Sequence, residues 1–276
     1  MADLYRFSQF SRLAYPGGNP GFDPSHPAAM NCRLSAVSTG KNFVQIYGGT
    51  PGKSGTITSS PTSAIVGAQG FATKFNSSNF ADKVSFANQP VNDDQVGTFG
   101  LIFTLTALNS GSVKYICSTD SNSNLNGWRL YKSTTQTLTV LTNAATSSTS
   151  TFVMALNTPY FIGVSIGPTN TYYAFTNLQT GQLVLESQST AKVPAGAPNG
   201  TYAIGNTGET PIGVDAWISH FMFSGIHISQ QRLQQWALDP WSFWYPRRAF
   251  NVVAAAVAAT GWGPLLSGRR SRLIAA

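Results

Sequence analysis

Short segments in which apolar and polar residues alternate follow one another along most of this chain, and glycine, asparagine and serine separate them. The clearest example is TFGLIFTLTAL, from Thr98 to Leu108, which is rich in β-branched and aromatic residues. Segments of this kind favour β-strands. Many short strands at fairly regular spacing, with turn residues between them, are typical of an antiparallel sandwich or barrel. The pattern therefore predicts an all-β protein.

The other strand candidates lie on both sides of this segment. GFATKFNSSNFADKVSF, from Gly70 to Phe86, alternates around a polar NSSN turn and predicts a hairpin. The remaining candidates are VKYICS, GWRLYK, QTLTVLT, TFVMAL, YFIGVSIG, TYYAFTN, QLVLES, TYAIGN and GVDAWISHFMFSG. No ten-residue stretch in this part of the chain has a helical period.

One helix is predicted after the last strand, in ISQQRLQQWALDP. Ser229 is a good N-cap, because its hydroxyl oxygen can accept a hydrogen bond from a free amide of the first turn. Leu233, Trp236 and Ala237 lie on one face at helical spacing, and Pro240 ends the helix. The sequence thus predicts a single short C-terminal helix.

The formal net charge is +7, yet the charge is unevenly distributed. Five arginines and no acidic residue lie in 247–276, which leaves 12 basic against 10 acidic residues in the rest of the chain. A nearly neutral body argues against nucleic-acid binding. Cys32 and Cys117 occur in unrelated contexts and are expected to be buried free thiols. The first ten residues contain no apolar signal-peptide core, so synthesis in a cytoplasm is expected.

Both ends of the chain differ from the strand-rich region in composition and in hydrophobic pattern. Residues 1–63 show little periodicity and include AYPGGNPGFDPSHPA, which predicts an extended arm or loop region that packs on the sandwich or on a neighbour. Residues 247–276 contain NVVAAAVAATGWGPLL, an apolar stretch too short and too interrupted for a membrane span. We expect 247–276 to be a docking arm. Its contact residues are predicted to be Arg247, Arg248, Val252, Val253, Trp262, Arg269 and Arg270.

The segment ALDPWSFWYPRR, residues 237–248, concentrates aromatic rings between two prolines. It suits a ligand-stacking platform, a nucleic-acid contact or a structural clasp. The prolines hold the chain extended after the helix, and rings of this size are usually buried. We therefore predict a clasp that covers the edge of the sandwich. Its members are Trp236, Pro240, Trp241, Phe243 and Trp244.

Groups for catalysis are sparse. Only two glutamates occur, Glu186 and Glu209, and they lie in different segments. Glycoside hydrolysis by the usual route needs two carboxylates on either side of the bond, and no Glu-x-Asp-x-Glu triplet is present. Asp93 and Asp94 are adjacent, so on a strand they would point to opposite faces. The three histidines show no metal-ligand spacing. These absences predict a protein that is not an enzyme and needs no cofactor.

Three stretches together resemble the laminin-G and concanavalin A-like lectin sandwich family, in the form found among phage structural proteins. GFATKFNSSNFADKVSF resembles an early hairpin of that family, and YAIGNTGETPIGVDAWISHFMFSGIHIS resembles its late pair of strands. SQQRLQQWALDPWSFWYP is similar to the short helix and the Pro-Trp segment that close the family's sandwich. The resemblance covers roughly residues 64–246. It implies a jelly-roll of two antiparallel sheets over that range, flanked by terminal arms.

Members of this family bind glycans or proteins through rim loops, sometimes with calcium. The nearest match here to the calcium loop is STDSNSNLNGW, with Asp120 and Asn122 as weak candidates, and our expectation is that no metal is bound. Exposed rings stack well on sugar faces. A glycan site would accordingly use Trp128, Tyr172 and Tyr173 together with Asn126.

The resemblance and the two arms together predict a structural protein of a phage virion. The two forms considered are a capsid decoration (cement) protein and a head or tail fibre subunit, anchored through the terminal arms. Other virion proteins (capsid, portal or tail subunits) are the expected partners, in a homo-oligomer such as a trimer, without nucleic acid or a membrane span. Two alternatives stay open: a carbohydrate-binding adhesin for host surface glycans, and a cryptic glycan hydrolase.

Overall fold

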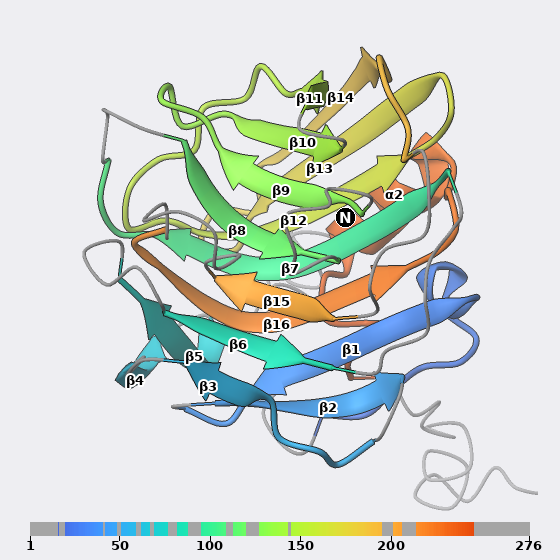
Figure 1. The fold of residues 1–276 in the computed structure, drawn as a ribbon. Helices are drawn as coiled ribbons and strands as arrows, with labels where there is room; N and C mark the ends of the chain where they lie inside the picture. The colour runs from blue at the N-terminus through green and yellow to red at the C-terminus, as the bar shows by residue number, and fades with distance from the viewer. Residues whose placement is uncertain are drawn as a thin grey trace, which may run out of the picture. The chain divides into compact units, whose positions relative to one another are not determined.

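A computed structural model describes the chain over residues 16, 20–40, 42–48, 51–58, 62–66, 69–76, 82–87, 95–108, 113–119, 127–142, 145–194, 201–205 and 214–245. These residues form two antiparallel β-sheets that face each other, with one α-helix outside them (Figure 1). The predicted all-β sandwich with a single short C-terminal helix is therefore confirmed. All of the predicted C-terminal arm, 247–276, falls outside the described residues, as do 1–15 and 17–19 of the predicted N-terminal arm.

The first sheet has nine strands. Its main path runs in the order β14-β13-β12-β7-β16-β1-β2, and β5 pairs with β16 and β4 beside that path. These strands are β1 (Cys32–Ser38), β2 (Phe43–Gly48), β4 (Thr62–Val66), β5 (Gly70–Phe75), β7 (Gly97–Leu105), β12 (Pro159–Ile166), β13 (Asn170–Asn177), β14 (Leu183–Ser189) and β16 (Ala216–Ser224).

The second sheet has seven strands in the order β11-β10-β9-β8-β15-β6-β3. They are β3 (Thr56–Thr58), β6 (Lys83–Phe86), β8 (Lys114–Ser118), β9 (Arg129–Lys132), β10 (Leu138–Thr142), β11 (Ala145–Thr149) and β15 (Tyr202–Gly205). The main apolar core lies between the two sheets, and Phe99, Leu130, Ile162, Tyr202 and Phe221 are among its fully buried members. Burial of this continuous apolar area is the main force that holds the sheets together.

Strands β1, β2 and β3 lie within the range 1–63, which the sequence analysis treats as an arm. The sandwich therefore includes these residues from Cys32 onward, because β1 pairs with the central strand β16 and β2 pairs with β1. The sequence pattern did not identify β1 as a strand because Leu34, Ser35, Ala36 and Val37 are all buried. A strand covered on both faces shows no alternation of polar and apolar residues.

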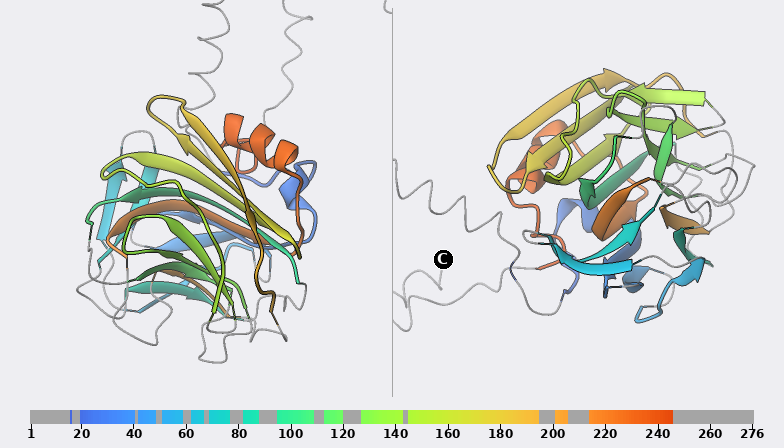
Figure 2. Two further views of the ribbon diagram at one scale, coloured as in Figure 1. Left: turned by 90° about the horizontal axis from the view of Figure 1, so that it is seen from above. Right: turned by 90° about the vertical axis from the view of Figure 1, so that its left-hand side faces the viewer.

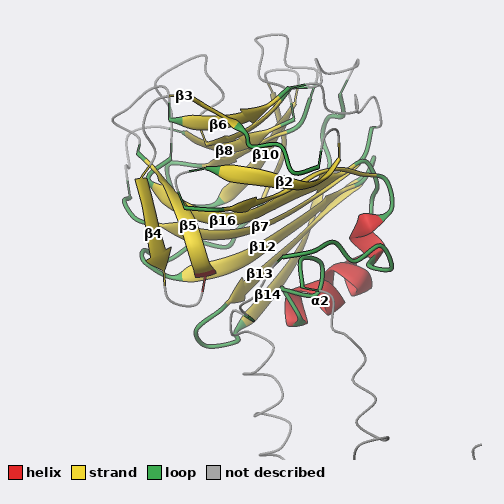
Figure 3. Cartoon of the chain, turned by 90° about the horizontal axis from the view of Figure 1, so that it is seen from below, coloured by secondary structure: helices red, strands yellow, loops and turns green. Residues whose placement is uncertain are grey.

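The helix α2 (Gln230–Leu238) lies outside the first sheet, on the side that faces away from the second sheet (Figures 2 and 3). Ser229 caps it as predicted, since its side chain accepts the Arg232 N–H, and Leu233, Trp236 and Ala237 are its buried residues. Because one face of the first sheet meets the core and the other meets this helix, β7 and β12 are buried along their whole length.

Two glycines that face each other on neighbouring strands let the helix approach the sheet. Gly100 of β7 and Gly163 of β12 are paired in register. A Cβ at Gly163 would lie 2.8 Å from Leu233 Cδ1, and a Cβ at Gly100 would overlap the six-membered ring of Trp236. The two positions thus form a shallow depression that receives the helix side chains.

We expect Gly100→Ala to lower the free energy of unfolding by about 1–3 kcal/mol, because the added methyl group overpacks this contact. Urea denaturation measures the change. Combining it with Trp236→Phe, which shortens the ring, should cost less than the sum of the two single variants. Additive costs would show that Gly100 and Trp236 are not in steric contact.

Candidate functional site

Two tyrosines lie next to each other on the outer face of the second sheet, which no helix covers in the part of the chain that the structure describes (Figure 3). Tyr115 of β8 is paired with Tyr131 of β9, and the ring centroids are 6.1 Å apart in an edge-to-face arrangement. Both side chains are half-buried. Part of each ring therefore stays accessible from solvent.

A β-bulge in β8 creates this pair. The register shifts between Tyr115 and Cys117, so Ile116 is the extra residue and Cys117 pairs with Leu130. The insertion turns both Ile116 and Cys117 toward the core, where both are fully buried. Tyr115 consequently stays on the outer face opposite Tyr131, and bulges commonly re-aim side chains in this way.

The guanidinium of Arg129 packs on the ring of Tyr115. Arg129 lies two residues before Tyr131, hence on the same face of β9, and its guanidinium carbon is 5.8 Å from the centroid of the Tyr115 ring. Its side chain is only 2% exposed. A buried cation over a tyrosine ring restrains the ring and contributes about 0.5–2 kcal/mol.

Hydroxyl groups continue the row of outward side chains beyond Tyr131. Thr139 of β10 pairs with Tyr131, and Thr149 of β11 pairs with Thr139. The two threonine hydroxyls are 3.2 Å apart, and the Tyr131 hydroxyl is 3.3 Å from that of Thr146. Thr139 is only 1% exposed, whereas Thr146 and Thr149 are exposed. The row Tyr115, Tyr131, Thr139 and Thr149, with Arg129 beneath it, is called the tyrosine face below.

The tyrosine face combines partly exposed rings with hydroxyl groups along a line across four strands. Strands lie about 4.8 Å apart, so the row extends over about 14 Å. Aromatic rings offer an apolar surface with a polar edge, and hydroxyls both donate and accept hydrogen bonds. This chemistry suits a ligand whose faces are apolar and whose rim carries hydroxyl groups.

The rings chosen from the sequence as a glycan site do not form one. Trp128 and Tyr173 are fully buried in the core, and burial raises the pKa of the Tyr173 hydroxyl. Tyr172 lies on the opposite face of β13, where its ring stacks on His227 with centroids 5.2 Å apart. Asn126 lies outside the described residues. Trp128 and Tyr173 therefore lie in the core between the sheets, whereas Tyr172 lies on the helix side of the first sheet.

Period-two alternation in GWRLYK is the signal that identifies the outward residues. Trp128 and Leu130 share the core face of this segment, whereas Arg129 and Tyr131 share the outer face. Residue type alone favoured Trp128, since tryptophan is a strong stacking group. The position in the strand decides against it.

The calcium candidates Asp120 and Asn122 lie outside the described residues, so a calcium site there stays untested. Within the described ranges, no group of three or more His, Cys, Asp and Glu side chains is placed to hold a metal ion. Glu186 of β14 holds the segment that follows β11, because its carboxylate accepts hydrogen bonds from the Thr151 N–H and hydroxyl, both at 2.8 Å. Glu209 is also outside the described residues.

The residues assigned to the clasp lie in a second apolar cluster on the helix side of the first sheet. They are all buried: Trp236, Pro240, Trp241, Phe243 and Trp244. The N-terminal segment takes part as well, since Gly21 N–H donates to Trp244 O at 2.7 Å and Asp23 N–H donates to Phe243 O at 3.1 Å. These rings pack on one another and on the first sheet.

Histidines complete this cluster. His220 packs edge-to-face on Trp241 and Trp244 at centroid distances of 5.2 and 5.1 Å, and its Nε2 is 3.3 Å from the Tyr245 hydroxyl. His26 packs in the same way on Trp236 at 4.9 Å. Burial lowers the pKa of His220 to about 3 and that of His26 to about 4, so both rings are neutral at pH 7.

Comparison with known proteins bears on the fold. No protein-family model and no curated protein matches the sequence. Among solved structures, a botulinum neurotoxin type G receptor-binding domain matches with a TM-score of 0.53 and 15% identity over 74% of this chain and 50% of that one. A Trypanosoma rangeli sialidase in complex with sialic acid matches with a TM-score of 0.49 and 13% identity, over 85% of this chain and 37% of that one. This chain thus spans half or less of either structure.

At these identities the likeness shows a two-sheet β-sandwich fold and nothing finer. The predicted phage origin and laminin-G type are not tested by it. The prediction that the protein is not an enzyme is contradicted. Sialidases are among the solved structures that the chain resembles, so a fold of this kind does not exclude an enzyme. The same likeness assigns no activity to this chain.

Proposed function

We propose that this protein binds a carbohydrate through the tyrosine face. The observation that carries the proposal is the pair of half-buried rings, Tyr115 and Tyr131, on the sheet face that no described helix covers. A pyranose ring presents a face of C–H groups and a rim of hydroxyls. The accessible tyrosine surface matches the first, and the hydroxyls of the exposed Thr146 and Thr149 match the second.

The length of the row favours an oligosaccharide over a single sugar. From the strand spacing, Tyr115 and Thr149 lie about 14 Å apart across four strands, which is longer than one sugar ring. Arg129 is too buried to contact the ligand, so its role is to position Tyr115. A botulinum neurotoxin receptor-binding domain contains a similar fold over half of its chain.

We expect Tyr131→Ala to weaken binding of the best ligand on a glycan array by about tenfold or more, because stacking on one ring contributes about 1–1.5 kcal/mol and its hydroxyl contributes further. Isothermal titration with the selected oligosaccharide measures the change. Tyr47→Ala is the matched control, since Tyr47 is 38% exposed on β2 of the other sheet. An equal loss in both variants, or no glycan bound by the unaltered chain, contradicts the proposal.

Trp128→Ala is not a test of glycan binding. Its side chain is fully buried in the core, so the substitution would lower stability whether or not a glycan binds. Binding variants belong on Tyr115 and Tyr131 instead.

A role as a virion component remains a separate proposal that rests on the terminal segments and not on the sandwich. Residues 247–276 carry five arginines, no acid and a long apolar stretch, a composition suited to docking on another protein. We expect deletion of 249–276 to abolish incorporation into particles or oligomers while the sandwich stays folded. Size-exclusion chromatography with light scattering detects the change. Unchanged assembly of the truncated chain would exclude an anchoring role for these residues.

A further inference from the structure

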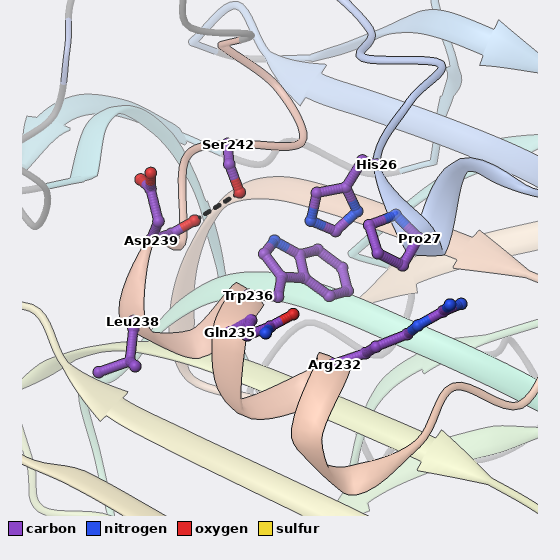
Figure 4. A pocket seen from close by; sticks show the side chains of 8 residues that line it. All are labelled: His26, Pro27, Arg232, Gln235, Trp236, Leu238, Asp239 and Ser242. Atoms are coloured by element: carbon purple, nitrogen blue, oxygen red, sulfur yellow. Dashed lines mark hydrogen bonds between the residues drawn. The ribbon is translucent and has the colours of Figure 1, made fainter.

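A groove lies between the helix α2 and the short 3-10 turn η1 (Pro27–Ala29), on the side of the molecule opposite the tyrosine face. Its volume is about 360 Å³, within the range of small-molecule sites. Figure 4 shows the side chains around it, with the ring of His26 above the indole of Trp236 and with Arg232 and Asp239 at opposite ends. The full lining is His26, Pro27, Arg232, Gln235, Trp236, Leu238, Asp239 and Ser242.

Internal contacts fix the shape of the groove before any ligand enters. The ring of His26 packs edge-to-face on Trp236 with centroids 4.9 Å apart, and Trp236 Nε1 donates to Pro240 O at 3.2 Å. The Ser242 hydroxyl donates to Asp239 O at 2.7 Å. A site restrained in this way loses little entropy when a ligand binds.

His26 brings a hydrogen-bond donor to the groove. Its Nδ1 accepts the Ala28 N–H at 3.1 Å, so the neutral ring carries its proton on Nε2. The side chain is only 9% exposed, and Nε2 has no hydrogen-bond partner in the part of the chain that the structure describes. A donor that is kept from water and left unpaired costs free energy, so an acceptor atom placed in the groove would remove that cost.

Arg232 supplies a positive charge that has no counter-charge within the described ranges. Its side chain is exposed, and the two nearby acidic residues are engaged elsewhere. Asp239 lies at the opposite end of the groove and makes a further interaction within the chain. Asp23 accepts hydrogen bonds from the Ser25 N–H and hydroxyl at 2.9 and 2.6 Å. A lone guanidinium suits a single negative charge, and its planar fork of donors matches a carboxylate.

Apolar surface lies between the two ends of the groove. Pro27, Trp236 and Leu238 line it, and Leu238 is 40% exposed. Arg232 and Asp239 are seven residues apart, which is about 10 Å along a helix axis, so the groove has room for a molecule of about that length. A rigid ring suits this middle part, because it buries apolar area and loses less conformational entropy than a flexible chain.

We propose that this groove binds a small aromatic monocarboxylate, whose carboxylate pairs with Arg232 and whose ring packs against Pro27 and Leu238. A hydroxyl or carbonyl oxygen at the far end of the molecule accepts the His26 Nε2–H. Gln235 lies three residues after Arg232, hence on the same face of the helix, and its exposed amide donates to the same carboxylate. The site is independent of carbohydrate binding on the tyrosine face.

Titration of the full chain with para-coumarate tests the proposal, because this acid carries one carboxylate, one ring and one phenol hydroxyl in a flat molecule. Two-dimensional NMR follows the indole N–H signal of Trp236, which is assigned by its loss in Trp236→Phe. We expect saturable binding with a Kd of about 1 mM or below, as suits a ligand of this size. Arg232→Gln should weaken binding about fivefold or more, since the charge-assisted pair is lost.

Two related probes separate the contacts. The neutral para-coumaramide should bind the unaltered chain about fivefold more weakly than the acid, and its Kd should be the same for Arg232→Gln. Cinnamate, which lacks the hydroxyl, should bind the unaltered chain more weakly than para-coumarate does. That difference should vanish in His26→Phe, which keeps a ring but has no N–H to donate.

Lys53→Gln is the matched control, because it removes the same charge at an exposed position outside the groove and should leave the Kd unchanged. The proposal is overturned if the Trp236 signal does not respond to para-coumarate, or if Arg232→Gln binds it as tightly as the unaltered chain does. It is also overturned if the unaltered chain binds para-coumaramide or cinnamate as tightly as para-coumarate.

Discussion

Replacing Trp236 by alanine is expected to lower the free energy of unfolding by about 3–5 kcal/mol, a large part of the stability of a typical domain. The indole is 2% exposed and lies where four parts of the chain meet. It packs on His26 and Phe161 at centroid distances of 4.9 Å, on Phe243 at 5.7 Å and on Trp244 at 5.9 Å. Its removal leaves a cavity that rigid neighbours cannot fill.

Urea denaturation followed by fluorescence and by circular dichroism measures this loss. Gln234→Ala on the same helix is the matched control, because its side chain is exposed and the change should stay within about 0.5 kcal/mol. A cost below about 1 kcal/mol for Trp236→Ala would show that the helix and the clasp do not stabilise the sandwich.

Acidification from pH 7 to pH 5 is the second large effect, with an expected loss of about 4 kcal/mol from His26 and His220 together. Burial lowers the folded pKa of these rings to about 4 and about 3, from 6.5 in the unfolded chain. Between these values and 6.5 the unfolded chain binds more protons than the folded one. Stability is therefore complete above about pH 6.5 and falls as the pH decreases.

Unfolding free energies at pH 7.5, 6 and 5 give the slope. At pH 5, protonation of one imidazole stabilises the unfolded chain by about 2 kcal/mol relative to the folded chain. Two imidazoles therefore give the expected loss of about 4 kcal/mol in the free energy of unfolding. The double variant His26→Gln/His220→Gln should be less stable at pH 7.5 but should lose most of the slope, because neither amide titrates. The same slope in both proteins would show that other groups cause the acid sensitivity.

Elements defined by local pattern could be predicted from the sequence. The helix is one, because a cap at Ser229, an apolar face and a proline all fall at the right spacing. TFGLIFTLTAL is another, and it forms β7. In contrast, TFVMAL from Thr151 forms no strand, and the Thr151 N–H donates to the Glu186 carboxylate. The edge strand β11 is polar and carries no apolar alternation that would identify it.

The pairing of the two tyrosines depended on details that no local pattern contains. Tyr115 and Tyr131 are sixteen residues apart and meet only because β8 and β9 pair in a register that includes the bulge at Ile116. Trp128 was preferred from its residue type, although the alternation of its own strand turns it inward. The groove at α2 likewise joins His26 to residues more than two hundred positions away.

The sequence by itself determined the class of fold, the single helix with its cap and stop, and the concentration of basic charge in 247–276. These follow from interactions between residues close in the chain, or from composition. Only the tertiary structure decided which rings face solvent, that β1 belongs to the centre of a sheet, and that histidines lie buried among the clasp rings. Strand pairing and burial join residues distant in the chain, so the accessible side chains depend on the whole packed molecule.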